Sequence, residues 1–199
     1  MSKKKRTAAI KRDTKETRIS LSLDLDGSGE GVVDTGIGFF NHMLELFKKH
    51  ALVDLTVKAA GDTDVDYHHT VEDVGLVLGR AIDKALGDRK GIVRYGNMIL
   101  PMDESLILTA VDLSGRSHLT CELQIPTEKV GDFDTELVEE FWTAFVRSAE
   151  ATLHIRQLSG SNSHHIIEGT FKSAARCLRQ AVSIDPLFAD EIPSTKGVL

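Results

Sequence analysis

The spacing of hydrophobic positions changes several times along the 199-residue chain, and each change predicts a different element. From Glu16 to Asp26 apolar residues occupy every second position, which is the period of a half-buried strand. From Gly36 to His50 they recur at three- and four-residue intervals, as on one face of a helix. The segment 52–59 alternates again, and 69–86 returns to the helical period, with Gly87 where a helix end favours glycine.

The second half of the chain repeats this order. Its predicted elements are strands at 105–113 and 117–125 joined by a turn at 114–116, a helix at 136–149, a strand at 152–158 and a helix at 163–183 with Ser163 as N-cap. A unit of this size that occurs twice is typical of a duplicated domain and not of a solenoid. We therefore predict an α+β fold, internally duplicated, in which each half packs its two helices on one face of its own sheet.

The duplication also sets the expected boundaries. We expect a first α+β repeat at 1–92, a second at 93–185, and a C-terminal tail at 186–199 that closes over a bound substrate.

A short motif, His-His-x-x-Glu, occurs at the same place in both halves. Its copies are His68-His69-Thr70-Val71-Glu72 and His164-His165-Ile166-Ile167-Glu168, 96 residues apart. Residues three and four apart on a helix share one face, and imidazole with carboxylate suits a divalent transition metal. A single copy is usually a solvated surface pair, but two copies, each with an extra histidine, indicate a metal site.

Comparison of the two halves extends the set of candidate ligands. His42 lies on the first predicted helix, 26 residues before His68, and Glu140 lies 24 residues before His164. Adjacent residues on a helix point about 100° apart, so we expect each histidine pair to be divided between two ions. Nitrogen and oxygen ligands suit Mn, Fe, Co, Ni or Zn, and the lack of thiolates argues against a closed structural zinc site. The candidate ligands are His42, His68, His69, Glu72, Glu140, His164, His165 and Glu168.

Two other kinds of metal site fit less well. The inverse helical metalloprotease pattern needs histidine where this chain has Asp73. The carboxylate di-iron bundle uses Glu-x-x-His and contains no sheet. His50, His118 and His154 have no counterpart in the other half, and we interpret the last two as packing or surface residues.

A second group of residues suits a phosphate. Arginine makes bidentate contacts with phosphate and lysine provides a point charge. Lys172 follows His164 by two helical turns, and the tail segment 194–197 adds hydroxyls and flexible backbone. Each cation alone is an ordinary surface charge, but their grouping near a metal site suggests an anionic substrate. The group comprises Arg94, Arg116, Lys172, Ser194, Thr195 and Lys196.

Composition narrows the class of protein. A net charge of −6 argues against general nucleic-acid binding. No apolar run approaches the ~18 residues that span a bilayer, and no signal-peptide pattern is visible. Cys121 and Cys177 do not suggest a disulfide framework, so we expect two reduced thiols in a cytoplasmic protein with no membrane partner.

The combined motifs resemble the imidazoleglycerol-phosphate dehydratase family of histidine biosynthesis. The resemblance extends over essentially the whole chain. It is carried by TGIGFFNHML at 35–44, DVDYHHTVED at 64–73, LHIRQLSG at 153–160, NSHHIIE at 162–168 and PSTKG at 193–197.

The resemblance implies two Mn²⁺ ions per active site and trimers that assemble into a 24-subunit shell, with sites shared between subunits. It implies metal ligands at His42, His68, His69, Glu72, His164, His165 and Glu168. It implies substrate contacts at His42, Arg94, Arg116, Lys172, Ser194, Thr195 and Lys196, with Glu16 reaching the substrate from a neighbouring subunit. Many family members carry histidine where this chain has Glu140, although carboxylate also binds hard divalent ions.

The implied activity is that of a metal-dependent carbon–oxygen hydro-lyase. It would convert D-erythro-imidazole glycerol phosphate to imidazole acetol phosphate and water. Our hypothesis is that two divalent metals stabilise an imidazolate intermediate while Glu16 removes the carbon-bound proton. The ligand set alone leaves open a two-metal phosphoester hydrolase and a non-catalytic, metal-assembled shell or storage protein.

Overall fold

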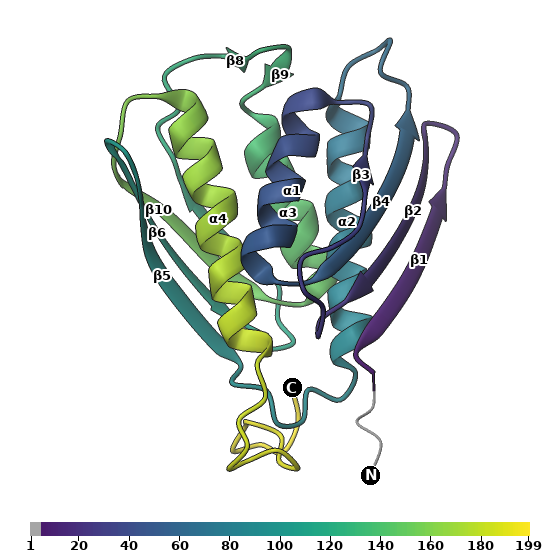
Figure 1. Cartoon of the computed structure of the whole chain (residues 1–199), viewed down its shortest axis with the longest axis vertical. Coiled ribbons are helices and arrows are strands. Elements are labelled where there is room, and N and C mark those ends of the chain that lie inside the picture. Colours follow the sequence, from purple (N-terminus) through teal and green to yellow (C-terminus); the bar gives the residue numbers. More distant parts are fainter. Residues whose placement is uncertain (1–4) are drawn as a thin grey trace.

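The computed structural model describes residues 5–199, in which two four-stranded sheets enclose a layer of four helices (Figure 1). The first sheet contains β1 (Thr7–Asp13), β2 (Thr17–Asp24), β4 (Asp54–Gly61) and β3 (Val33–Asp34), in that order. The second contains β5 (Tyr95–Met102), β6 (Ser105–Asp112), β10 (Thr152–Ser159) and β7 (His118–Glu122). The helices are α1 (Gly38–Ala51), α2 (His68–Leu86), α3 (Leu137–Ala149) and α4 (Ser163–Val182), and β8 (Lys129–Val130) with β9 (Phe133–Asp134) forms a small hairpin.

The two sheets share one topology, which confirms the internal duplication and the α+β class. In each sheet three strands pair antiparallel and the last pairs in parallel. The first helix of each repeat also ends at a non-glycine residue with left-handed backbone, Leu52 after α1 and Glu150 after α3. His42 and Glu140 each lie ten residues before these ends, so they occupy equivalent places.

The helices of the two repeats interlock between the sheets. α2 lies on the first sheet and α4 on the second, while α1 packs against α4 and α3 packs against α2 (Figure 1). The first sheet is held to the helix layer by one face of its strands. In β2, alternate residues from Thr17 to Leu23 are buried against the helices. Among the described helices, none is long and apolar enough to cross a membrane.

Two glycines allow α2 and α3 to approach closely. A Cβ atom on Gly79 would lie 2.4 Å from the carbonyl oxygen of Phe145, and one on Gly75 would lie 2.7 Å from that of Phe141. Both distances are shorter than a van der Waals contact to backbone, which does not move aside easily. The contact therefore fixes the separation of the two helices.

All four helices begin at the same end of the molecule (Figure 1). The turn between β1 and β2 and the hairpin between β5 and β6 reach that end as well, whereas the tail 186–199 lies at the opposite end (Figure 1). The helix starts bring unpaired N–H groups and partial positive charge to one surface. Both histidine motifs, at the starts of α2 and α4, therefore lie on that surface.

Three local predictions are wrong. Strand β5 was missed because Gly96 and Pro101 interrupt its pattern, and an edge strand tolerates both residues. The strands predicted at 105–113 and 117–125 form as β6 and β7, but the turn between them does not make them neighbours, because β7 pairs in parallel with β10. The N-cap of α4 is Asn162, whose side chain accepts the N–H groups of His164 and His165, and Ser163 is the first helical residue.

We predict that Gly79→Ala lowers the stability of the fold. Alanine normally stabilises a helix interior by ~1 kcal/mol relative to glycine, but the clash with Phe145 should cost about 1–3 kcal/mol or more. The net loss of up to about 2 kcal/mol should lower the melting temperature by about 2–8 °C, at roughly 2–4 °C per kcal/mol for a chain of this size. Gly38→Ala is the control, because nothing lies within 4 Å of a Cβ atom there. A Gly79→Ala protein that melts at or above the wild-type temperature would contradict this account.

Candidate metal centre

Helices α1 and α4 bring three candidate ligands together. The Nε2 atoms of His42 and His164 lie 3.3 Å and 3.1 Å from the same oxygen, Oε2 of Glu168. Potential ligand atoms of the three residues all lie within 4.8 Å of one another. Ligands at roughly 2.1 Å from a divalent ion are themselves roughly 3 Å apart, so these residues fit one ion. His42 is exposed and Glu168 is buried, so the cluster opens to the surface at His42 and ends in the interior at Glu168.

Glu168 divides its two oxygens between the cluster and a lysine. Lys172 Nζ lies 2.5 Å from Oε1, on the next turn of α4. Burial alone would raise the pKa of Glu168, but hydrogen bonds from Lys172 and His164 outweigh it and lower the pKa. The carboxylate is therefore ionised at neutral pH, as a metal ligand must be.

The second histidine of each pair is bonded to a carboxylate instead. His165 Nδ1 lies 2.7 Å from Glu104 Oε2, and His69 Nδ1 lies 3.0 Å from Asp62 Oδ2. These hydrogen bonds raise the pKa of both histidines. The rings of each pair are close to perpendicular, with centroids 6.3 Å apart for His164 and His165 and 6.1 Å apart for His68 and His69. Such divergence suits ligands of two different ions.

The histidine motif of α2 and Glu140 on α3 stand apart from the cluster. Among the described residues, neither the motif of α2 nor Glu140 belongs to the His42 group. Glu72 Oε1 pairs with Arg147 Nη2 at 3.0 Å, and Glu140 is half-buried on α3. One chain therefore presents a three-residue cluster and, at the same end, a separate set of candidate ligands on α2.

Glu16 lies in the turn between β1 and β2, beside the first-repeat histidines. The hydroxyl of Thr14 accepts the N–H groups of Glu16 and Thr17, and the Thr17 hydroxyl donates to Asp73 on α2 at 2.5 Å. The Glu16 carbonyl accepts the N–H of Asp62. The Glu16 side chain itself is exposed, in a turn that is fixed to α2.

Most of the predicted phosphate contacts lie at the other end of the molecule. Arg94 donates to Asp112 at 2.7 Å and 3.1 Å and to the carbonyl of Pro193 at 2.8 Å, and its N–H bonds to Ala181 at the end of α4. Arg116 is exposed nearby, next to Gly115, which contacts the chain end at Leu199. At ~1.5 Å per residue, this end of α4 is about 25 Å from His164. Within one chain, only Lys172 of the cations joins the metal cluster.

Sequence reasoning missed the carboxylates that surround the candidate ligands. Glu104 follows the hairpin residue Asp103, and Asp62 follows β4, so both lie in turns where acidic residues are common. Asp112 is the last residue of β6, and its partner Arg94 lies eighteen residues earlier in the sequence. No periodic pattern distinguishes these residues from ordinary turn and surface acids.

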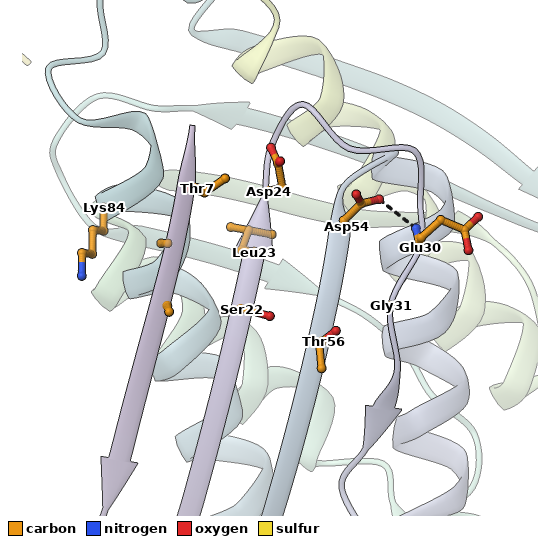
Figure 2. A pocket seen from close by; sticks show the side chains of 11 residues that line it. Thr7, Ser22, Leu23, Asp24, Glu30, Gly31, Asp54, Thr56 and Lys84 are labelled. Carbon is orange, nitrogen blue, oxygen red and sulfur yellow. Dashed lines mark hydrogen bonds between the residues drawn. The ribbon is translucent and has the colours of Figure 1, made fainter. Parts of the chain in front are cut away.

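A hollow of about 650 Å³ on the first sheet contains none of the candidate residues. Figure 2 shows Thr7, Asp24, Asp54 and Lys84 around it, with Asp54 accepting the N–H of Glu30 at 3.0 Å. It lies where β1 begins and β2 ends, away from the helix starts (Figure 1). Concavity alone therefore does not locate the site.

Comparison with known proteins agrees with the motifs. The sequence profile described as imidazoleglycerol-phosphate dehydratase matches residues 35–178. The chain is 61% identical over 194 residues to the imidazoleglycerol-phosphate dehydratase of Desulforamulus reducens, covering 98% of each chain. It is 57% identical to that of Thermosynechococcus vestitus, covering 98% of this chain and 92% of the relative.

Solved structures show the same fold. The imidazoleglycerol-phosphate dehydratase of Staphylococcus aureus superposes with a TM-score of 0.82 at 41% identity, covering 90% of this chain and 99% of that one. The enzyme of this kind from Pyrococcus furiosus superposes with a TM-score of 0.83 at 35% identity, covering 96% and 100%.

We predict that Glu168→Gln weakens metal binding. Glutamine keeps the shape but removes the charge that His42, His164 and Lys172 share, so Mn²⁺ affinity should fall at least about tenfold. Calorimetric titration with Mn²⁺ and metal analysis after dialysis measure the change, with Glu128→Gln, an exposed glutamate, as the matched control. Wild-type metal content and affinity in Glu168→Gln would remove Glu168 from the ligand set.

Proposed function

The chain belongs to the imidazoleglycerol-phosphate dehydratase family, and from this we infer that its two histidine motifs hold the metal ions of a dehydratase. The activity is a dehydration in histidine biosynthesis, which makes the protein a lyase. We propose D-erythro-imidazole glycerol phosphate as substrate, and imidazole acetol phosphate and water as products. One observation carries the assignment to this chain: His42 and His164 both approach the same carboxylate oxygen of Glu168. His164 and Glu168 belong to the motif that occurs twice.

We propose two Mn²⁺ ions per active site. Mixed imidazole and carboxylate donors fit such an ion, and Glu140 adds a carboxylate where many relatives carry histidine. Bound metal supplies Lewis acidity to the imidazole ring nitrogens of the substrate. The residues proposed to hold the two ions are His42, His68, His69, Glu72, Glu140, His164, His165 and Glu168.

We propose that each active site is shared between subunits. The metal cluster and the Arg94 region lie about 25 Å apart along α4, which is far longer than a substrate whose ring and phosphate are joined by three carbons. The candidate ligands on α2 also stand apart from the cluster in one chain. Trimers that assemble into a 24-subunit shell would bring these parts of different chains together.

Glu16 is the proposed general base. Its turn is held to α2 through Thr17 and Asp73, so an exposed carboxylate is kept beside the first-repeat ligands. Glu16 takes the carbon-bound proton and passes it to the neighbouring hydroxyl, which departs as water, and the remaining enol becomes the ketone when its proton moves from oxygen to carbon. Because the backbone of the turn is held in place, only the Glu16 side chain needs to rotate to reach the substrate carbon.

The cations and the tail are proposed to hold the phosphate. Arg94 donates a hydrogen bond to the carbonyl of Pro193, the residue directly before Ser194, and this contact supports a joint role for the guanidinium and the tail. Phosphate binding at this non-reacting end would orient the imidazole end for proton transfer. The residues proposed for this role are Arg94, Arg116, Lys172, Ser194, Thr195 and Lys196, with His42 touching the substrate at the metal end.

Family membership favours the dehydratase over the phosphoester hydrolase and the metal-assembled shell that the ligand set alone allows. We also propose a cytoplasmic location, which is consistent with two free thiols, Cys121 and Cys177, and with the biosynthetic role of the family.

We predict that Glu16→Gln reduces turnover by at least about a hundredfold, because it removes a general base. Metal content, Mn²⁺ affinity and the size of the assembly should stay at wild-type values, since Glu16 is not a proposed ligand. Steady-state kinetics and size-exclusion chromatography measure these quantities, with Glu30→Gln as an exposed control in another turn. Unchanged turnover would eliminate Glu16 as the base.

We predict that two inactive variants complement each other. Chains carrying His69→Asn and chains carrying Glu168→Gln should each be inactive alone. After dissociation and joint reassembly, about a quarter of sites would combine an intact first-repeat half with an intact second-repeat half from another chain. Recovered activity supports shared sites, whereas continued inactivity of mixed assemblies would show that both halves must come from one chain.

A further inference from the structure

We propose that Glu104 and Asp62 are positioning residues, each of which holds the second histidine of a pair so that its Nε2 is presented to a metal. The inference rests on the proposed metal-binding role of His165 and His69. It concerns two residues that lie in turns and are not proposed ligands.

Glu104 uses its two oxygens for different purposes. Oε1 accepts the N–H groups of Ser161 and Asn162 at 3.2 Å and 2.9 Å and the hydroxyl of Ser105 at 2.9 Å. Among the described residues, the hydrogen-bond partner of Oε2 is the ring of His165, whose Nδ1 lies 2.7 Å away. Glu104 therefore ties the segment before α4 to the β5–β6 hairpin and also orients the histidine.

A carboxylate beside Nδ1 selects the form of the ring that can bind a metal. The carboxylate accepts a hydrogen bond from Nδ1–H, which keeps the proton on Nδ1 and leaves the lone pair of Nε2 for the ion. His165 Nε2 lies 3.8 Å from Asp103 Oδ2, beyond hydrogen-bond distance, so that nitrogen is not held by a close partner there. His69 has the same arrangement, with Nδ1 held by Asp62.

The two carboxylates occupy places that are not equivalent in the duplication. Glu104 immediately precedes β6, and the residue that immediately precedes β2 is Glu16. Asp62 immediately follows β4, and the residue that immediately follows β10 is Gly160. Position 160 has no room for a side chain, because a Cβ atom there would lie 2.3 Å from the hydroxyl of Ser105. Duplication alone therefore does not explain why both histidines meet a carboxylate.

Because the carboxylates come from different positions in the two repeats, the glutamates that precede β2 and β6 have different roles. In the second repeat, Glu104 must hold His165 because position 160 cannot. In the first repeat Asp62 holds His69, while the exposed side chain of Glu16 makes no hydrogen bond within the described part of the chain. Asp62 thereby leaves Glu16 available for the substrate.

Glu104→Gln tests the positioning role directly. An amide has one accepting oxygen, and the three donors at Oε1 will hold it. The amide NH₂ group then faces His165 Nδ1 and donates to it, which moves the ring proton to Nε2 and blocks metal binding. We expect Mn²⁺ affinity by calorimetry to fall about tenfold or more, with loss of a nitrogen coupling in pulsed electron paramagnetic resonance of the bound Mn²⁺.

Asp62 offers a contrasting pair of variants. Its second oxygen, Oδ1, is buried without a hydrogen-bond partner, so an asparagine can place its NH₂ group there and keep an oxygen towards His69. Asp62→Asn should therefore stay within about threefold of wild-type Mn²⁺ affinity, whereas Asp62→Ala should lose about tenfold. If Asp62 served only to stabilise the fold, Asp62→Asn would also be damaging, because its NH₂ group would be buried without an acceptor. Mn²⁺ affinity that is kept in Asp62→Asn and lost in Asp62→Ala would therefore support the positioning role.

The controls separate this inference from the proposed function. Glu122→Gln, on β7 and paired with Arg156, should leave Mn²⁺ binding and the resonance spectrum unchanged. His165→Asn should lose the nitrogen coupling outright. If His165→Asn binds Mn²⁺ as the wild type does, the ligand assignment fails. If His165→Asn loses Mn²⁺ while Glu104→Gln keeps wild-type affinity and spectrum, only the positioning role is overturned.

Discussion

The close approach of α2 and α3 at Gly75 and Gly79 is the constraint on which the arrangement of the molecule depends. These helices belong to different repeats, so their contact locks one half of the chain against the other. With α1 against α4 on the other side, both histidine motifs are held at one end of a rigid layer. A metal site made of several helices needs this rigidity, because ligands must stay within a fraction of an ångström of their places.

Much of the fold could be predicted because strands and helices repeat their buried residues at different intervals along the sequence. Burial on one face produces the alternation of β2 and the helical spacing of α1, and the same patterns recur in the second half. Strand β5 lacked such a signal because it lies at a sheet edge, where Gly96 and Pro101 are tolerated. The parallel pairing of β7 could not be predicted locally, since it depends on a strand that comes thirty residues later.

The candidate site was predictable where chemistry and repetition coincide. His164 and Glu168 are four apart on a helix, so their meeting is local and visible in the sequence. The partners of the second histidines are not local, because Glu104 is 61 residues from His165 and reaches it only through the hairpin between β5 and β6. Arg94 looked like a free cation, but tertiary structure commits it to Asp112 and to the tail.

Helix α4 sets the distance between the metal cluster and the Arg94 region. His164 lies near its first residue, and the main chain at Arg94 bonds to Ala181 near its last. One residue inserted between them would lengthen the helix by ~1.5 Å and turn the histidines by about 100° relative to the tail. An error of this kind would be repeated in every subunit of a symmetric assembly. An insertion or deletion in the interior of α4 would therefore disturb the metal cluster and the Arg94 region at once.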